Sequence, residues 1–108
     1  MSEINMLASL MYLENYAKTG FDKSAENGFD RFHQHLSSRY NRLIMDLSNQ
    51  EGPFVIECRT RLEKVRAEHN KYINRDLESV RASIAQAQSN AQRKYLREVE
   101  GKLLESLI

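Results

Sequence analysis

The feature that most constrains this chain is the stretch from Phe54 to Glu100, which contains neither glycine nor proline. Within it an apolar or small residue returns every three or four positions, the spacing of one face of an α-helix. The stripe consists of Val55, Cys58, Leu62, Val65, His69, Ile73, Leu77, Val80, Ile84, Ala87, Ala91, Tyr95 and Val99. One continuous helix here would be about 70 Å long, more than the remaining chain could cover. Part of the stripe must therefore fold back or meet a partner.

Two shorter helices are predicted ahead of this stretch. Residues 3–18 have apolar side chains on more than one side, so this helix should be buried over most of its surface and should end where Gly20 can adopt a left-handed cap. Residues 29–48 carry a single stripe made of Phe29, Phe32, Leu36, Tyr40, Leu43 and Leu47. No window alternates apolar and polar residues as a strand would.

The connector between these helices contains Gly-Phe-Asp twice, at residues 20–22 and 28–30. It could be a loop that offers Phe21 and Phe29 to a partner. The favoured interpretation is a connector in which Asp, Ser and Asn cap helices while both Phe rings fill the core. Further along, Pro53 suits the first turn of the next helix, where an N–H would have no intrahelical partner.

The period of the long stripe is about 3.7 residues, whereas a sustained two-stranded coiled coil requires 3.5. A local coiled-coil-like seam in a bundle or dimer is still expected from Ile73 to Ala91. Residues 82–92 carry no charge, and the helix could bend or stop at Ser89-Asn90. We predict one all-α domain over residues 1–108, with two shorter helices packed on a long C-terminal one. The expected helices are 3–18, 29–48, 53–88 and 90–107, the last two either separate or continuous.

Composition narrows the class of protein. The hydrophobic fraction of 41% and the charged fraction of 29% suit an ordinary helical domain, and a formal net charge of +1 gives no field toward nucleic acid or membrane. A single cysteine cannot form an intramolecular disulfide, which favours the cytoplasm. Neither a secretory signal nor a membrane span is expected.

Few residues suggest chemistry. His33 and His35 point in different directions on a helix, and no further ligands complete a zinc site, so no metal or cofactor is predicted. His69 lies on the apolar stripe, where a core histidine or a polar register marker is favoured over a pH switch. Cys58 is expected to be a buried small hydrophobe. Because no phosphate-binding loop or nucleophile elbow is present, we predict a protein without catalytic activity or a small-molecule substrate.

Basic residues of the long helix supply the main competing signal, since on one face they could contact phosphates. They are Arg59, Arg61, Lys64, Arg66, Lys71, Arg75 and Arg81. Acidic residues such as Glu57, Glu68 and Glu78 interleave with them at helical spacing, which favours a solvated surface with salt bridges over a nucleic-acid contact or an acidic protein partner.

The leading hypothesis is a helical protein–protein interaction module, such as an assembly factor, chaperone, adaptor or inhibitor, that packs against itself or a partner. A homo-oligomer is expected. The alternatives are a small oligomeric nucleic-acid-binding protein and a structural subunit of a larger helical assembly. The predicted interface is the distal stripe, because the first two helices should cover only the proximal part. It comprises Val80, Ile84, Ala87, Ala91, Tyr95, Val99, Leu103 and Leu107.

Overall fold

A computed structural model describes residues 2–26 and 28–108, and over this range the chain is an all-α bundle. The α-helices are α1 (Glu3–Gly20), α2 (Phe29–Leu47), α3 (Pro53–Gln86) and α4 (Asn90–Glu105), and a short 3-10 helix, η1 (Phe21–Lys23), follows α1. No strand occurs in the described part. The predicted fold class is confirmed, and each predicted helix has a counterpart within a few residues.

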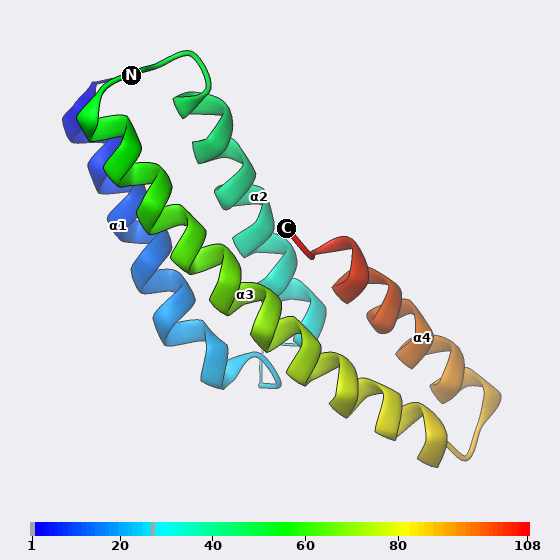
Figure 1. Cartoon of the computed structure of the whole chain (residues 1–108). Coiled ribbons are helices and arrows are strands. Elements are labelled where there is room, and N and C mark those ends of the chain that lie inside the picture. Colours follow the sequence, from blue (N-terminus) through cyan, green and yellow to red (C-terminus); the bar gives the residue numbers. More distant parts are fainter. Residues whose placement is uncertain (1, 27) are drawn as a thin grey trace.

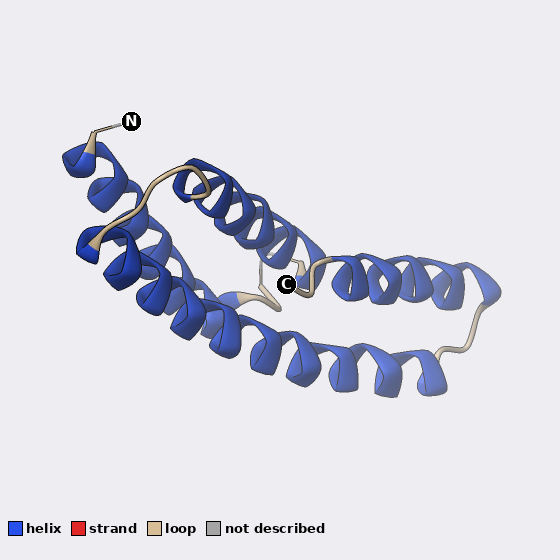
Figure 2. Cartoon of the chain, turned by 45° about the horizontal axis from the view of Figure 1, so that its top comes forward, coloured by secondary structure: helices blue, strands red, loops and turns tan. Residues whose placement is uncertain are grey.

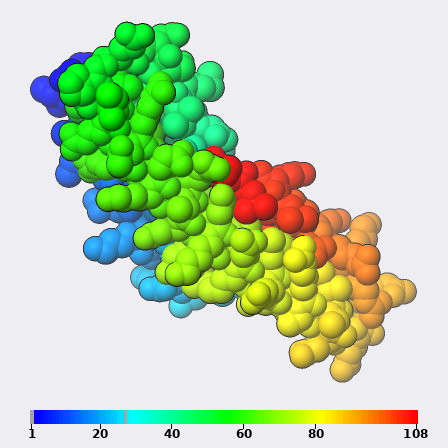
Figure 3. Space-filling model, in the orientation of Figure 1, coloured from blue at the N-terminus to red at the C-terminus, as the bar shows by residue number. Residues whose placement is uncertain are grey.

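The helices form an elongated molecule of 55 × 23 × 18 Å. Figure 1 shows α1, α2 and the first half of α3 side by side, while the second half of α3 extends beyond them and α4 returns along it. The view in Figure 2 shows the turn between α3 and α4 at the far end of the molecule. The space-filling view shows the same wide end and narrower extension (Figure 3).

Two hydrophobic clusters divide the interior. The larger one belongs to α1, α2 and α3 up to Val65, which we call the proximal body. The smaller one joins α3 from Ile73 onward to α4, which we call the distal hairpin. It contains Ile73, Leu77, Val80, Val99 and Leu103, with Phe29 of α2 and Ile84 packed against it.

The break in the long helix answers the question that its sequence left open. α3 ends at Gln86, and Ala87 takes an extended conformation with ψ 131°. Ser89 then caps α4 by accepting a hydrogen bond at 3.1 Å from the backbone N–H of Gln92. The long stripe therefore folds back on itself, so its length no longer requires a second chain.

Two local expectations, one at Gly20 and one at Pro53, have different outcomes. The left-handed cap expected at Gly20 is wrong, because Gly20 has φ −90° and the chain continues into η1. A Cβ built on Gly20 would lie 2.0 Å from the Phe32 ring, so the residue is small to let α2 approach. Gly52, with φ 116°, precedes Pro53, which opens α3 as predicted.

The Gly-Phe-Asp connector is a packed element. Phe21 is buried and stacks on Tyr72 at 4.2 Å between ring centroids. Phe29 is half-buried against the distal cluster. The favoured interpretation of both rings as core residues is confirmed. The expected capping of the next helix by an Asp or Ser side chain is wrong, because the N-cap of α2 is Gly28 and accepts no side-chain hydrogen bond, and capping by Asn27 lies outside the described residues.

Candidate functional site

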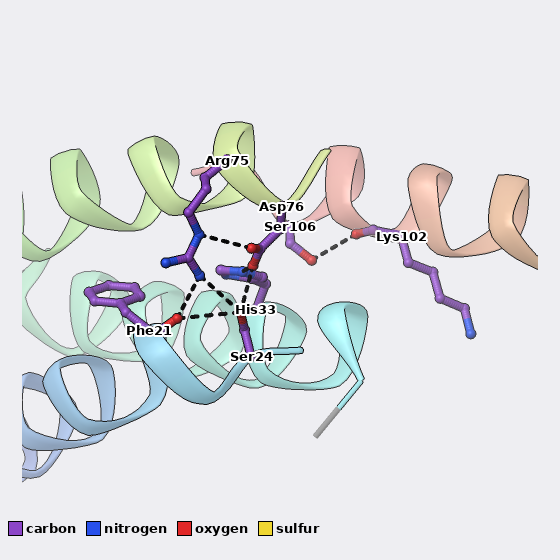
Figure 4. Close-up of polar contacts among 7 residues, drawn as sticks. All are labelled: Phe21, Ser24, His33, Arg75, Asp76, Lys102 and Ser106. Atoms are coloured by element: carbon purple, nitrogen blue, oxygen red, sulfur yellow. Dashed lines mark hydrogen bonds and ion pairs between the residues drawn. The ribbon is translucent and has the colours of Figure 1, made fainter. Parts of the chain in front are cut away.

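A buried polar cluster lies where the proximal body meets the distal hairpin (Figure 4). The carboxylate of Asp76 on α3 is its centre. Oδ2 of Asp76 accepts a hydrogen bond from Ser24 Oγ at 2.8 Å and lies 2.7 Å from Nε2 of His33 on α2. Arg75 Nε donates to the other carboxylate oxygen at 3.1 Å. The cluster thus joins α2, α3 and the segment after η1.

Asp76 remains a carboxylate in spite of its burial. Burial alone would raise the pKa of Asp76, but hydrogen bonds from His33, Ser24 and Arg75, together with the charge of Arg75, outweigh it, so the pKa lies below its usual value. Arg75 also donates to the backbone oxygen of Phe21 at 2.6 Å, which ties the end of α1 to α3.

His69 stacks on His33 with ring centroids 5.0 Å apart and an interplanar angle of 23°. Both side chains are 0% exposed. Nδ1 of His33 and both ring nitrogens of His69 have no hydrogen-bond partner among the described residues. Burial, with a smaller contribution from His33, lowers the pKa of His69 to about 3, so the ring is neutral near pH 7.

The cluster brings a serine, a histidine and an aspartate together, but not in the order of a nucleophilic triad. Ser24 donates to Asp76 rather than to His33, so the histidine does not lie between the serine and the aspartate as it does in such a triad. All three side chains are buried. In the described part of the chain, no three His, Cys, Asp or Glu side chains are grouped to hold a metal ion. The arrangement can hold a buried charge and take up a proton.

The residues of the predicted distal interface are divided between the interior and the surface. Val80, Ala87, Val99 and Leu103 are buried within the chain and Ile84 is half-buried, because α4 covers the end of α3. Ala91, Tyr95 and Leu107 are exposed. The fold-back thus uses within one chain most of the stripe that was expected to meet a partner.

A more continuous apolar surface lies on α1. Ile4 is 80% exposed, Met11 is 50% and Tyr12 is 49%. Ala8 is exposed between them, and no charged residue occurs from Ile4 to Leu13. The expectation that α1 would be buried over most of its surface is wrong, because α2 and α3 cover only its Met6, Leu10, Leu13 and Ala17 side.

Beside this surface, a groove of about 610 Å³ runs between α1 and α2. Ser9 lines it from α1, and from α2 it is lined by His35, Ser38, Arg39, Arg42, Leu43 and Asp46. The Arg39 guanidinium lies 4.4 Å from the centre of the Tyr12 ring and donates to His35 Nε2 at 2.8 Å. The apolar ridge and the basic wall of the groove are therefore in direct contact.

The basic residues of α3 are largely engaged. Arg61 pairs with Glu14, Arg66 with Glu63, Arg75 with Asp76 and Arg81 with Glu100. Arg59 donates to the backbone oxygen of Leu47 at 3.1 Å, and Lys64 and Lys71 are exposed without an ion pair in the described part. By contrast, Arg31, Arg39 and Arg42 of α2 form no ion pair with a described residue.

Sequence reasoning identified His69 and Cys58 as buried, and both are. Burial raises the pKa of the Cys58 thiol, which disfavours the reactive thiolate. The sequence did not lead us to predict the cluster formed by His33, Asp76, Arg75 and Ser24. The available signal was Asp76 itself, a charged residue seven positions after His69 and next to Leu77 on the apolar stripe.

The chain was compared with protein-family models, curated proteins and solved structures, and none of them matches it. Among the described helices, none is long and apolar enough to cross a membrane.

Proposed function

We propose that the protein is a non-catalytic interaction module whose docking face takes an amphipathic helix from a partner protein. The docking face consists of Ile4, Ala8, Met11 and Tyr12 on α1 together with Arg39 and Arg42 on α2. The partner helix would present an apolar stripe flanked by acidic residues. The observation that carries the proposal is the exposed, uncharged ridge of α1 beside a basic groove.

The shape of the face favours a helix as the occupant. The residues that line the groove span three turns of α2, from His35 to Asp46. Ile4, Ala8 and Met11 follow the spacing of one helix face, with the small Ala8 in the middle, where another helix could approach closely. Exposed apolar ridges of this kind are uncommon on isolated domains and are typical of binding surfaces.

Charge favours an acidic partner. Arg39 and Arg42 lack ion pairs with described residues, whereas most arginines of α3 have an acidic partner within the chain. Acidic side chains beside the apolar stripe of a partner would pair with these two arginines at the edge of the interface. Such pairs mainly set the preferred partner and its orientation, while the apolar ridge supplies most of the affinity.

The test uses two synthetic helical peptides of about 20 residues with the same leucine stripe, one with glutamate and one with lysine on the other faces. Titration followed by backbone NMR shifts should place the glutamate peptide on α1 and α2, with at least about tenfold higher affinity than the lysine peptide. Equal affinities, shifts confined to other helices, or no binding would overturn the proposal.

Matched variants locate the contact. Met11→Asp should lower the affinity for the glutamate peptide at least about tenfold, because a carboxylate would be placed in the apolar seam. Ile56→Asp is the control, since Ile56 is 66% exposed but lies on α3. Loss of binding in both variants would contradict a specific contact between the peptide and α1. A labelled DNA or RNA that binds more tightly than the glutamate peptide would favour the nucleic-acid alternative.

A further inference from the structure

The two hydrophobic clusters are separated on α3 by a polar layer. On α3 the buried residues of the proximal cluster end at Val65, with the half-buried Tyr72 also packed against that cluster, and the buried residues of the distal cluster begin at Ile73. His69 lies between them and stacks on His33, which in turn contacts Asp76. The layer is fully buried, so any change of its charge must be accommodated by the packing around it.

Stability alone does not explain His69. A buried imidazole without hydrogen bonds loses its contacts with water and gains none in return, so an apolar side chain of similar volume would be at least as favourable. What an imidazole offers and an apolar side chain lacks is the uptake of a proton near neutral pH once water reaches it.

The end of α4 closes the layer on one side. Arg66 and Asn70, which flank His69 on α3, donate to the main-chain oxygen of Ile108 at 3.1 and 3.0 Å. Ser37, one turn after His33 on α2, donates to the main-chain oxygen of Ser106. The Arg66 contact is exposed and has a charged donor, whereas the other two are partly buried. Together they hold the segment that follows α4 across the seam between α2 and α3, at the level of the two histidines.

We propose that the His33–His69 layer is an acid-sensitive joint, and that proton uptake by His69 favours a form in which α4 has separated from α2 and α3. The proton comes from solvent and is bound by a ring nitrogen of His69 that has no partner in the closed form. Separation of α4 hydrates the imidazolium, while α1, α2 and the first half of α3 keep their own core.

The groups around His69 set the sign of the effect. His33 of α2 contacts His69, and its charge adds to burial in lowering the pKa of His69. On α3, Asp76 and Arg75 are turned toward His33 and Ser24, and the segment after η1 contributes the neutral Ser24. Near the joint α4 contributes the neutral Ser106, and the charge of Lys102 is paired with Asp30. Among the described residues no carboxylate contacts His69 to stabilise its proton in the closed form.

The pH window follows from the two states. In the open form His69 should titrate near its ordinary pKa of 6.5, whereas in the closed form its pKa is about 3. The open form binds the proton more tightly. The stability of the closed form relative to the open form is therefore fully present above pH 6.5 and decreases as the pH falls toward 3. Between pH 7.5 and pH 5 the equilibrium constant for opening should rise roughly thirtyfold.

Hydrogen exchange of the whole chain at pH 7.5 and pH 5, corrected for intrinsic exchange rates, measures this constant helix by helix. We expect the protection of α4 to fall roughly thirtyfold in the wild-type chain while that of α1 changes little. His69→Leu should keep α4 protected at pH 5. His35→Leu, which removes an exposed histidine of α2, should behave as the wild type.

Three results would overturn the proposal. One is an α4 whose protection does not depend on pH, and another is equal acid sensitivity in His69→Leu and the wild type. The third is a simultaneous loss of protection in all helices, which would mean global unfolding rather than opening at the joint. If His69→Leu does not fold, NMR titration of the imidazoles in the wild-type chain decides. A His69 that titrates near pH 6.5 while α4 stays protected contradicts the joint.

Discussion

The proximal body and the distal hairpin are built from the same long helix but are stabilised to different degrees. In the proximal body α3 packs against two helices and contributes to the larger cluster. In the distal hairpin it packs mainly against α4, with Phe29 and Ile84 at the edge of a small cluster. The helix α3 is thus continuous, but the two regions that it joins can open separately.

The largest difference should come from two leucines that are both 0% exposed. Leu36→Ala in the proximal body should lower the free energy of unfolding by about 2–5 kcal/mol, since it leaves a cavity among three helices. Leu103→Ala should lower the free energy for local opening of α4 by a similar amount. It should lower the free energy of unfolding of the proximal body by less. Denaturant unfolding combined with hydrogen exchange separates the two effects. Equal loss of protection in all helices for both variants would show a single cooperative unit.

Two glycines should respond in opposite directions to the same substitution. Gly20→Ala places a Cβ 2.0 Å from the Phe32 ring in the proximal body and should destabilise by about 1–3 kcal/mol. At Gly101 in α4 a Cβ meets nothing within 4 Å, so Gly101→Ala should stabilise α4 by up to about 1 kcal/mol. Thermal midpoints of both variants provide the measurement. A stabilising Gly20→Ala would contradict the close approach of α1 and α2.

The smallest effects should come from two ion pairs, one in each region. Arg61 binds Glu14 through two nitrogens, whereas Arg81 contacts Glu100 through Nε at 2.8 Å. Both pairs are partly exposed, so double-mutant cycles should give less than about 1 kcal/mol for each, with the larger coupling for Glu14 and Arg61. Added salt should reduce both values. A coupling for Arg81 and Glu100 above that of the proximal pair would reverse the comparison.

Most of the helical architecture could be predicted because it depends on local patterns. The 3–4 spacing of apolar residues, Pro53 at the start of α3 and the gap in charge before Asn90 are all visible in the sequence. The break itself could not be decided locally, because Ala87, Gln88 and Ser89 all tolerate a helix. It takes the packing of Val99 and Leu103 against Val80 to favour the fold-back.

The candidate sites were harder to predict because they depend on distances between helices. His33 and Asp76 are far apart in sequence, and their contact requires the register of α2 against α3. Likewise, the exposure of Ile4 and Met11 follows from how many helices the chain supplies, and two apolar sides on α1 suggested burial instead. The small Gly20 was interpreted as a turn residue because the approach of Phe32 cannot be seen in the sequence.

The single thiol of the chain can be used to measure how fast the proximal body opens. Cys58 is 3% exposed and belongs to the proximal cluster. A thiol-reactive dye can label Cys58 only when the first half of α3 separates from α1 and α2. The labelling rate should therefore not depend on fraying of α4. Since no second cysteine competes for the reagent, the unmodified chain reports on the proximal core by itself.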